Sequence, residues 1–429
     1  MSKIASVKGR RVWDSRGNPT VEATIVLESG AWGRAIAPAG ASRGTREAMD
    51  LRDGGTRLEG LDVRTALENI ETRIAPALVG AEGGDQAGID GRLTALDPSP
   101  LKSLLGGNAT VAVSLAALHA AAAEAGLPLW RHVAAYYGRK PSIPLPEIQI
   151  FGGGAHAGRR VDVQDFMVMV PGAESFDEAL EITAEIYHAA GSIMSARGKS
   201  AGVADEGGWW PDFGSNEEAL ETLVAAIEAA GEKPGERVVI SLDIAASEFG
   251  RGGQYRLALE DRTLTSGEWT AELGRWLEAY PIASIEDPLA EDDTAGMREF
   301  TRRYGDRLQI VGDDYLVTNA GLVAEAVAAG ACNTALIKVN QAGTVTEAVA
   351  AYDAARAAGW RAIVSARSGE TEDVSISHLA VGLGASQLKV GSFARSERMA
   401  KWNECLRIAE EPGAGTFVGW APLSAPVKR

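Results

Sequence analysis

The chain has 429 residues, 45% hydrophobic and 23% charged, a balance typical of a globular protein with a large buried core. Its formal net charge of −16 at pH 7 excludes nucleic acid and membrane surfaces as general partners, whereas a small anionic substrate is allowed where local cations or metal compensate. The sequence has two cysteines, no apolar signal segment and no long apolar run, so we expect a cytoplasmic protein without disulfides or membrane spans.

The first third of the chain predicts a small α+β domain. Alternating apolar and polar residues indicate three strands, over 4–13, 20–27 and 33–37. Helical periodicity then dominates from about 64 to 137, and strands followed by helices are typical of α+β domains. Because a proline-dense joint follows at 141–146, we expect two domains, an N-terminal α+β capping domain over 1–138 and a C-terminal domain over 139–429.

Beyond the joint, short apolar strands alternate with amphipathic helices. The expected strands cover 238–242, 283–285, 308–311, 334–337, 362–365 and 387–388. Repeated βα units build either an open, doubly wound parallel sheet or a closed (β/α)8 barrel. Ionisable residues follow most of these strands, and closure is what brings all such strand ends around one mouth. We therefore expect the barrel.

Acidic residues end three of the expected strands: Asp243, Glu286 and Asp313. Three carboxylates in one mouth repel one another and raise one another's pKa, so a divalent cation is the natural compensation. Because no histidine or cysteine pair occurs at ligand spacing, oxygen donors favour Mg²⁺ or Mn²⁺ over zinc. Each acid could alternatively cap the helix that follows it, an interpretation that suits one such residue better than three.

Two lysines, Lys338 and Lys389, end further strands. Mutual repulsion and a nearby metal ion lower the pKa of an ammonium group, so one of them can serve as a neutral base; alternatively, both are solvated or paired with acids. Glu206 lies before two glycines, which let the backbone bring a carboxylate close to a ligand. His156 lies in a glycine-rich loop, a composition common in mobile lids.

Seven motifs, spread over essentially the whole chain, resemble the enolase family in identity and order. They are Asp14-Ser-Arg-Gly-Asn-Pro-Thr-Val-Glu22, His156-Ala-Gly, Asp205-Glu-Gly-Gly208, Ser284-Ile-Glu-Asp-Pro288, Lys338-Val-Asn-Gln341, Arg367-Ser-Gly-Glu-Thr-Glu-Asp373 and Ala394-Arg-Ser-Glu-Arg398. The resemblance implies an α/β fold, an enolase-type (β/α)8 barrel with an N-terminal α+β capping domain. It also implies a homodimer or larger homo-oligomer and a Mg²⁺-dependent elimination of water from a 2-phosphoglycerate-like acid.

The resemblance assigns roles by position. The three strand-end acids hold a first Mg²⁺, and Ser42, in the mobile loop 38–44, helps to recruit a second Mg²⁺ together with the substrate. Lys338 is the base that takes the proton from C2, and Glu206 is the acid that assists departure of the C3 hydroxyl. The implied substrate-binding residues are His156, Gln164, Asp165, Lys389, Ser368 and Arg367, the last as a phosphoryl clamp.

The chain departs from the family pattern around this site. Ala366 replaces a histidine, Asp165 a glutamate and Gly152 an asparagine, and each change removes volume or reach. Arg43 replaces a threonine and offers a planar fork suited to an additional carboxylate. Arg159 and Arg160 add two cations whose roles the sequence leaves open, as it does for the pair at 209–210, Trp209 and Trp210, which we expect to pack against a loop.

Three functions are compatible with these departures. The first is dehydration of 2-(carboxyphosphono)glycerate to carboxyphosphonoenolpyruvate, which explains the lost volume and the gained guanidinium together. The second is the ordinary glycolytic conversion of 2-phosphoglycerate to phosphoenolpyruvate. The third is a non-catalytic, enolase-like binding protein. The retained metal ligands, base, acid and phosphoryl clamp argue against the third function, and we favour the first because it alone accounts for both the losses and the gain.

Overall fold

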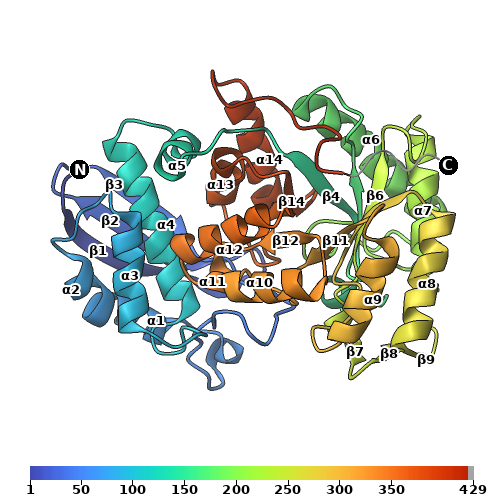
Figure 1. Cartoon of the computed structure of the whole chain (residues 1–429), viewed down its shortest axis with the longest axis horizontal. Coiled ribbons are helices and arrows are strands. Elements are labelled where there is room, and N and C mark those ends of the chain that lie inside the picture. Colours follow the sequence, from blue (N-terminus) through green and yellow to red (C-terminus); the bar gives the residue numbers. More distant parts are fainter. Residues whose placement is uncertain (424–429) are drawn as a thin grey trace.

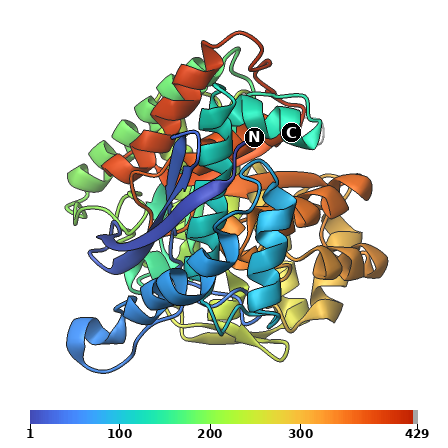
Figure 2. The same ribbon diagram turned by 90° about the vertical axis from the view of Figure 1, so that its left-hand side faces the viewer.

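The computed structural model describes residues 1–423, and a three-stranded antiparallel sheet organises its N-terminal part. The strands are β1 (Ile4–Trp13), β2 (Pro19–Leu27) and β3 (Trp32–Ile36), in that spatial order. Their bounds lie within one residue of those expected from the alternating pattern. Figure 1 shows this sheet at the left, and Figure 2 shows the same unit in front of the barrel.

Helices follow the sheet, as the sequence predicts. They are α1 (Arg64–Asn69), α2 (Ala75–Leu78), α3 (Gln86–Leu96), α4 (Gly107–Glu124) and α5 (Leu129–Tyr137). α4 packs along β2 and β3, and most of its residues are buried. Gly33 permits this packing, since a Cβ at that position would lie 2.2 Å from the backbone nitrogen of Ala120.

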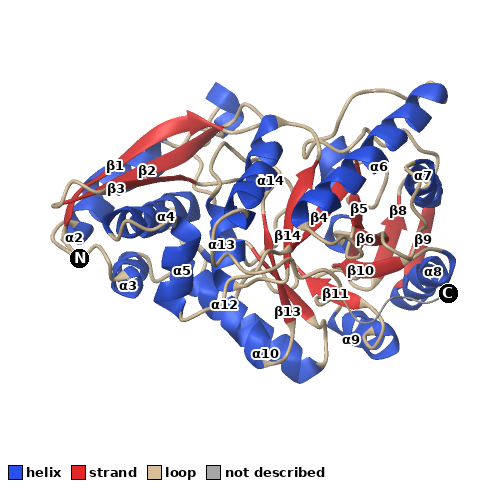
Figure 3. Ribbon diagram, turned by 90° about the horizontal axis from the view of Figure 1, so that it is seen from above, coloured by secondary structure: helices blue, strands red, loops and turns tan. Residues whose placement is uncertain are grey.

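The second unit is a closed eight-stranded barrel. In spatial order its strands are β10 (Ile282–Glu286), β11 (Gln309–Gly312), β12 (Thr334–Ile337), β13 (Arg361–Ser365), β14 (Gln387–Ser392), β4 (Leu145–Gly152), β5 (Asp165–Met169) and β6 (Val239–Asp243). Viewed from above in Figure 3, the strands are surrounded by helices. The expected enolase-type barrel with an α+β capping domain is therefore confirmed.

The sequence analysis missed the two strands that open the barrel, β4 and β5. They run antiparallel to each other, β5 also runs antiparallel to β6, and no α-helix separates β4 from β5. The βα repeat that predicted the other strands therefore does not extend to them. β4 is moreover buried along its whole length, and its polar residues Glu147 and Gln149 are buried with it, which obscures any alternating pattern.

Nine helices follow the barrel strands within residues 1–423. They are α6 (Phe176–Ala196), α7 (Asn216–Ala229), α8 (Ser266–Ala279), α9 (Thr294–Tyr304), α10 (Ala320–Ala329), α11 (Val339–Ala342), α12 (Val345–Ala357), α13 (Ser375–Leu383) and α14 (Ser396–Ala409). A small sheet of β7 (Gly250–Arg251), β8 (Gln254–Leu257) and β9 (Arg262–Thr265), which the sequence analysis did not expect, precedes α8. Among these described helices, none is by itself long and apolar enough to cross a membrane.

Buried hydrogen bonds join the two units. The Ser114 hydroxyl, in α4, accepts from the backbone nitrogen of Val345, in α12, at 2.9 Å, and Asp90 of α3 accepts from the backbone nitrogen of Thr346, also in α12, at 2.9 Å. The covalent joint begins where α5 ends at Gly138, whose left-handed φ of 62° suits glycine. The domain boundary expected between residues 138 and 139 stays a prediction.

Candidate active site

A polar cavity lies where barrel strands of the second unit meet the loop after β3. Its volume is about 320 Å³ including the open mouth. Side chains at the ends of the strands, the loop after β4 and the loop over the barrel all reach it. The lining residues are Gly40, Ala41, Ser42, His156, Gln164, Asp165, Glu206, Asp243, Lys338, Ser365, Ala366, Arg367, Ser368, Lys389 and Val390. The barrel thus brings all but three of the predicted site residues to one wall, the exceptions being Glu286, Asp313 and Arg43.

Glu286 and Asp313 lie just beneath the cavity, joined to it by the two strand-end lysines. The Lys389 ammonium donates to Asp243 Oδ2 and Glu286 Oε2, each at 2.8 Å. The Lys338 ammonium donates to Asp313 Oδ2 at 2.5 Å. All five side chains are buried. The acids and lysines that the sequence placed at strand ends therefore form one connected cluster.

Burial and neighbouring charge set the pKa values in this cluster. Burial, and then the negative charge of Asp243, raise the pKa of Glu286 well above its usual value. Burial lowers the pKa of Lys338, but the negative charges of Asp313 and Glu286 together outweigh that effect and leave the pKa raised. The lowered lysine pKa expected from mutual repulsion is not found, because each ammonium pairs with carboxylates.

The donor set fits a hard divalent cation. Within the described chain, Glu286 Oε1 is buried without a hydrogen-bond partner, so one carboxylate oxygen is free for a ligand. A further carboxylate, Asp287, accepts from the backbone nitrogens of Asp313 at 2.9 Å and Asp314 at 2.7 Å, which fixes the loop that carries Asp313. Among residues 1–423, two groups have ligand atoms close enough to hold a metal ion; Asp287, Asp313 and Asp314 form one of them, and the predicted trio of Asp243, Glu286 and Asp313 is not the other. Oxygen donors of this kind suit Mg²⁺.

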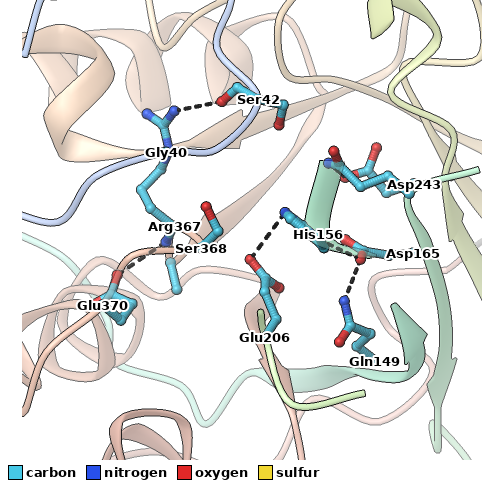
Figure 4. Close-up of polar contacts among 12 residues, drawn as sticks. Gly40, Ser42, Gln149, His156, Asp165, Glu206, Asp243, Arg367, Ser368 and Glu370 are labelled. Atoms are coloured by element: carbon cyan, nitrogen blue, oxygen red, sulfur yellow. Dashed lines mark hydrogen bonds and ion pairs between the residues drawn. The ribbon is translucent and has the colours of Figure 1, made fainter. Parts of the chain in front are cut away.

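A second charged cluster contains Glu206. His156 Nδ1 lies 3.0 Å from Asp165 Oδ1, and His156 Nε2 lies 3.7 Å from Glu206 Oε1 (Figure 4). Burial lowers the pKa of His156, but the charges of Asp165 and Glu206 outweigh it and raise the pKa to about 9. His156 is therefore an imidazolium at neutral pH, held between two carboxylates. These three residues form the other group with spacing suited to a metal ion.

Gln149 holds this cluster in place and was missed by the sequence analysis. Its amide nitrogen donates to Asp165 Oδ1, and its carbonyl oxygen accepts from the backbone nitrogen of Gly208 at 2.8 Å (Figure 4). It therefore ties Asp165 of β5 to the turn that carries Glu206. The only local signal was a polar residue within an otherwise apolar strand.

Arg367 ties the barrel to the loop that carries Ser42. Its Nη1 donates to Glu47 Oε2 at 2.9 Å and to Asn340 Oδ1 at 3.2 Å. Its Nη2 donates to the Ser42 carbonyl at 3.1 Å (Figure 4). Glu47 is buried and was also missed, since nothing in its surroundings along the chain indicates that it pairs with a residue 320 positions away. The Ser368 hydroxyl, beside Arg367, has no hydrogen-bond partner within residues 1–423.

The departures from the family pattern have different structural outcomes. Ala366 lines the cavity, as expected for a residue that enlarges it. Gly152 does not line the cavity, because Ala204 and Gln149 fill the space beside its Cα. A Cβ at Gly152 would lie 2.6 Å from Ala204 Cβ. The Arg43 side chain is exposed and does not line the cavity. The structure therefore supports only part of the expected enlargement.

The residues whose roles were left open lie outside the cavity wall. Arg159 pairs with Glu248 and Arg160 pairs with Asp212, each at 2.6 Å. Trp209 stacks on Tyr187 of α6 with ring centroids 4.9 Å apart, and its Nε1 donates to the Tyr187 carbonyl at 2.8 Å. Trp209 thus packs against helix α6 rather than against the expected loop, and it does not line the cavity.

Two family matches cover almost the whole chain. Residues 4–133 match the N-terminal domain of enolase, and residues 140–421 match the C-terminal TIM barrel domain of enolase. The first match contains the antiparallel sheet and the loop over the cavity, and the second contains every strand of the barrel. The chain therefore belongs to the enolase family, a family of hydro-lyase enzymes.

Proposed function

We propose that this protein is a Mg²⁺-dependent dehydratase that converts a 2-phosphoglycerate-like acid to its enol product. The observation that carries the proposal is that Lys338 and Glu206 line the same cavity as Lys389, Arg367 and Ser368. Elimination of water needs a base for the C2 proton, an acid for the C3 hydroxyl and cations for an anionic substrate. The lining supplies all three.

The side chains divide the work as follows. Lys338 takes the C2 proton once its ammonium has lost a proton and left Asp313. Glu206 must carry a proton when the substrate is bound; it gives that proton to the departing hydroxyl, and the His156 imidazolium, 3.7 Å away, stabilises the carboxylate that results. Lys389, Arg367 and Ser368 bind the carboxylate and phosphoryl groups of the substrate, and His156, Gln164 and Asp165 complete the wall around it.

Mg²⁺ is the cofactor implied by the family, and the acids beneath the cavity fit it. Asp243, Glu286 and Asp313 would hold one ion, and Ser42 would help to hold a second that arrives with the substrate. When bound, the ions supply positive charge against the negative charge that develops on the substrate carboxylate. The free oxygen of Glu286 supports this assignment.

We further propose that the substrate is 2-(carboxyphosphono)glycerate and the product carboxyphosphonoenolpyruvate. The chain would then resemble carboxyphosphonoenolpyruvate synthase, the enolase homologue of phosphinothricin-type antibiotic and phosphonate biosynthesis. Ala366 supports this choice because it leaves room in the wall beside Arg367. Arg43 would read the additional carboxyl group only if the loop 38–44 closes, since its side chain is exposed in the structure.

Two other functions compete with this one. The same acid, base and cations also suit ordinary conversion of 2-phosphoglycerate to phosphoenolpyruvate, and Asp165 still reaches His156 despite its shorter side chain. A non-catalytic binding protein is the third. We also propose a homodimer, the assembly the family favours, which light scattering at defined protein concentration would test.

A dehydration assay separates the three functions. The purified protein is incubated with excess Mg²⁺ and either 2-phosphoglycerate or 2-(carboxyphosphono)glycerate, and products are identified by phosphorus NMR. A higher kcat/KM on the carboxylated substrate is expected, together with loss of turnover in EDTA. A higher value on 2-phosphoglycerate would replace the proposed substrate with the glycolytic one, and no turnover of either would favour the binding protein.

Arg43→Thr tests whether the arginine contributes to that preference. We expect it to raise KM for the carboxylated substrate more than for 2-phosphoglycerate, because a guanidinium pairs with the extra carboxylate. Arg159→Thr, on an exposed arginine already paired with Glu248, is the matched control and should leave KM unchanged for both substrates. Equal effects of Arg43→Thr on both substrates would remove Arg43 from the specificity argument.

A further inference from the structure

Helix α14 buries two cationic side chains, Arg398 and Lys401, with no exposed surface on either. Withdrawing a guanidinium or an ammonium from water is costly unless its donors find good acceptors. Neither side chain lines the active-site cavity, and neither takes part in the chemistry proposed above. The acceptors they use therefore indicate what the two buried charges stabilise.

Within residues 1–423, the Nη atoms of Arg398 donate to backbone carbonyls of the cavity wall, while its Nε lies 3.5 Å from Glu397 Oε1. Its Nη1 donates to the carbonyls of Arg367 at 2.6 Å and Val390 at 2.9 Å, and its Nη2 donates to the carbonyl of Ser368. Arg367 and Ser368 lie in the segment just after β13, and Val390 directly follows Lys389 on β14. One guanidinium thus fixes the relative positions of the two strand ends that carry the proposed anion-binding side chains.

The planar peptide bond extends this effect into the cavity. Because a trans peptide directs its N–H opposite to its carbonyl, holding the carbonyls of Arg367 and Ser368 on Arg398 turns the next two N–H groups away from α14. The second of these, Gly369 N–H, donates to the Ala39 carbonyl at 2.8 Å in the loop that leads to Ser42. Arg398 therefore also orients the segment on which the cavity loop rests.

Lys401 reinforces the same segment one helical turn later. Its ammonium donates to the Thr371 carbonyl at 2.6 Å and pairs with Glu370 Oε2 at 2.9 Å. The other oxygen of Glu370 accepts from the backbone nitrogen of Arg367 at 3.1 Å (Figure 4). Two buried cations of one helix therefore hold segment 367–371 from behind, at both of its ends.

We propose that Arg398 is a positioning residue for the reaction: it holds the carbonyls of Arg367, Ser368 and Val390 so that Arg367, Ser368 and Lys389 face the anionic substrate together. The expected change in KM rests on the proposed function, whereas the expected loosening of segment 367–371 does not. A lysine at this position presents a single point donor in place of a planar fork, so it holds fewer of the three carbonyls.

The test compares Arg398→Lys and Arg398→Met with Lys102→Met. Lys102 is an equally buried cation that pairs with Glu347 at 2.8 Å, away from the cavity lining, so its variant controls for loss of a buried charge. On whichever glycerate the wild type dehydrates, we expect Arg398→Lys to raise KM at least tenfold, with a smaller fall in kcat. Lys102→Met should change KM less than twofold, although it lowers the Tm as the Arg398 substitutions do. Arg398→Met should raise KM more than Arg398→Lys does.

Hydrogen exchange provides a readout that needs no substrate. Backbone amides of 365–371 should exchange at least tenfold faster in both Arg398 variants, while those of the same segment in Lys102→Met keep the wild-type rate. Unchanged exchange in the Arg398 variants, or the same acceleration in the control, would overturn the inference. If the wild type dehydrates neither glycerate, the proposed function fails, and the exchange rates alone decide whether Arg398 positions the segment.

Discussion

Replacing Glu286 by glutamine should stabilise the metal-free protein and abolish its response to Mg²⁺. Glu286 is 1% exposed, and burial together with the charge of Asp243 raises its pKa well above the ordinary value of 4.5. A raised acid pKa stabilises the folded state at low pH and destabilises it as pH rises above the unfolded value. Glutamine keeps the shape and can still accept from Lys389, but it does not titrate.

The expected magnitude follows from the pH interval. Each pH unit between the unfolded pKa and the raised folded one contributes about 1.4 kcal/mol, so the advantage of the variant should grow as pH rises above 4.5. We expect it to reach about 1–2 kcal/mol at pH 7, because the Lys389 ammonium offsets part of the cost of ionising Glu286. At about pH 3 and below, the two proteins should be nearly equally stable, because Glu286 is then neutral in both folded and unfolded states.

Urea unfolding in EDTA and in excess MgCl₂, at fixed protomer concentration and several pH values, measures this effect. In MgCl₂ the order should reverse, because an ion that binds only the folded wild type stabilises it by mass action and displaces the Glu286 proton. Glu299→Gln, on the exposed surface of α9, is the control and should show neither the pH trend nor the reversal. A Glu286→Gln variant less stable than wild type in EDTA throughout, or stabilised equally by Mg²⁺, would refute the electrostatic reasoning.

Three further substitutions test separate parts of the structure. Lys338→Ala should reduce turnover at least about 10⁴-fold while Mg²⁺ binding, followed by calorimetry, stays within a few fold of wild type; appreciable turnover would remove Lys338 as the base. Gly33→Ala should lower stability by about 3 kcal/mol or more, because its Cβ would lie 2.2 Å from Ala120 N; an unchanged urea midpoint would show that β3 and α4 separate freely. Asp62→Asn removes a carboxylate whose pKa the Arg11 guanidinium lowers to about 2. The variant should therefore lose its full share of the free energy of unfolding above about pH 5, and the loss should shrink as pH falls from 3.8 toward 2. A loss that stays the same at every pH would contradict this pairing.

The site residues that were predicted best from the sequence are those that lie at the ends of apolar runs. Asp243 and Glu286 close a short hydrophobic strand and Lys338 follows one, and parallel strands that form a barrel bring such ends together. Lys389 lies within β14, because that strand continues to Ser392, beyond its expected end at 388. Local pattern and topology are enough for that inference. The identity of the cluster could therefore be predicted before any coordinate was known, whereas the pairing of each lysine with a particular acid could not.

The residues that the sequence missed act through contacts between distant segments. Glu47 meets Arg367, Gln149 meets Asp165, and Arg398 meets the carbonyl of Arg367. None has a periodicity or spacing that distinguishes it from a residue in an ordinary helix, strand or loop. For Arg43 the error runs the other way. Its residue type predicted a substrate contact, but its side chain is exposed, because packing decides the direction of a loop side chain.

Charge balance gives a physical reason to expect that this cavity needs metal ions for binding as well as for chemistry. Its cations are already paired: Lys389 with Asp243 and Glu286, Lys338 with Asp313, and Arg367 with Glu47. A substrate with a carboxylate and a phosphoryl group therefore meets little uncompensated positive charge, inside a chain whose net charge is −16. Divalent ions on the acids would release Lys389 and Lys338 to face the substrate and the C2 proton. A third anionic group on the substrate increases this requirement, so the carboxylated glycerate should depend on Mg²⁺ concentration more steeply than 2-phosphoglycerate does.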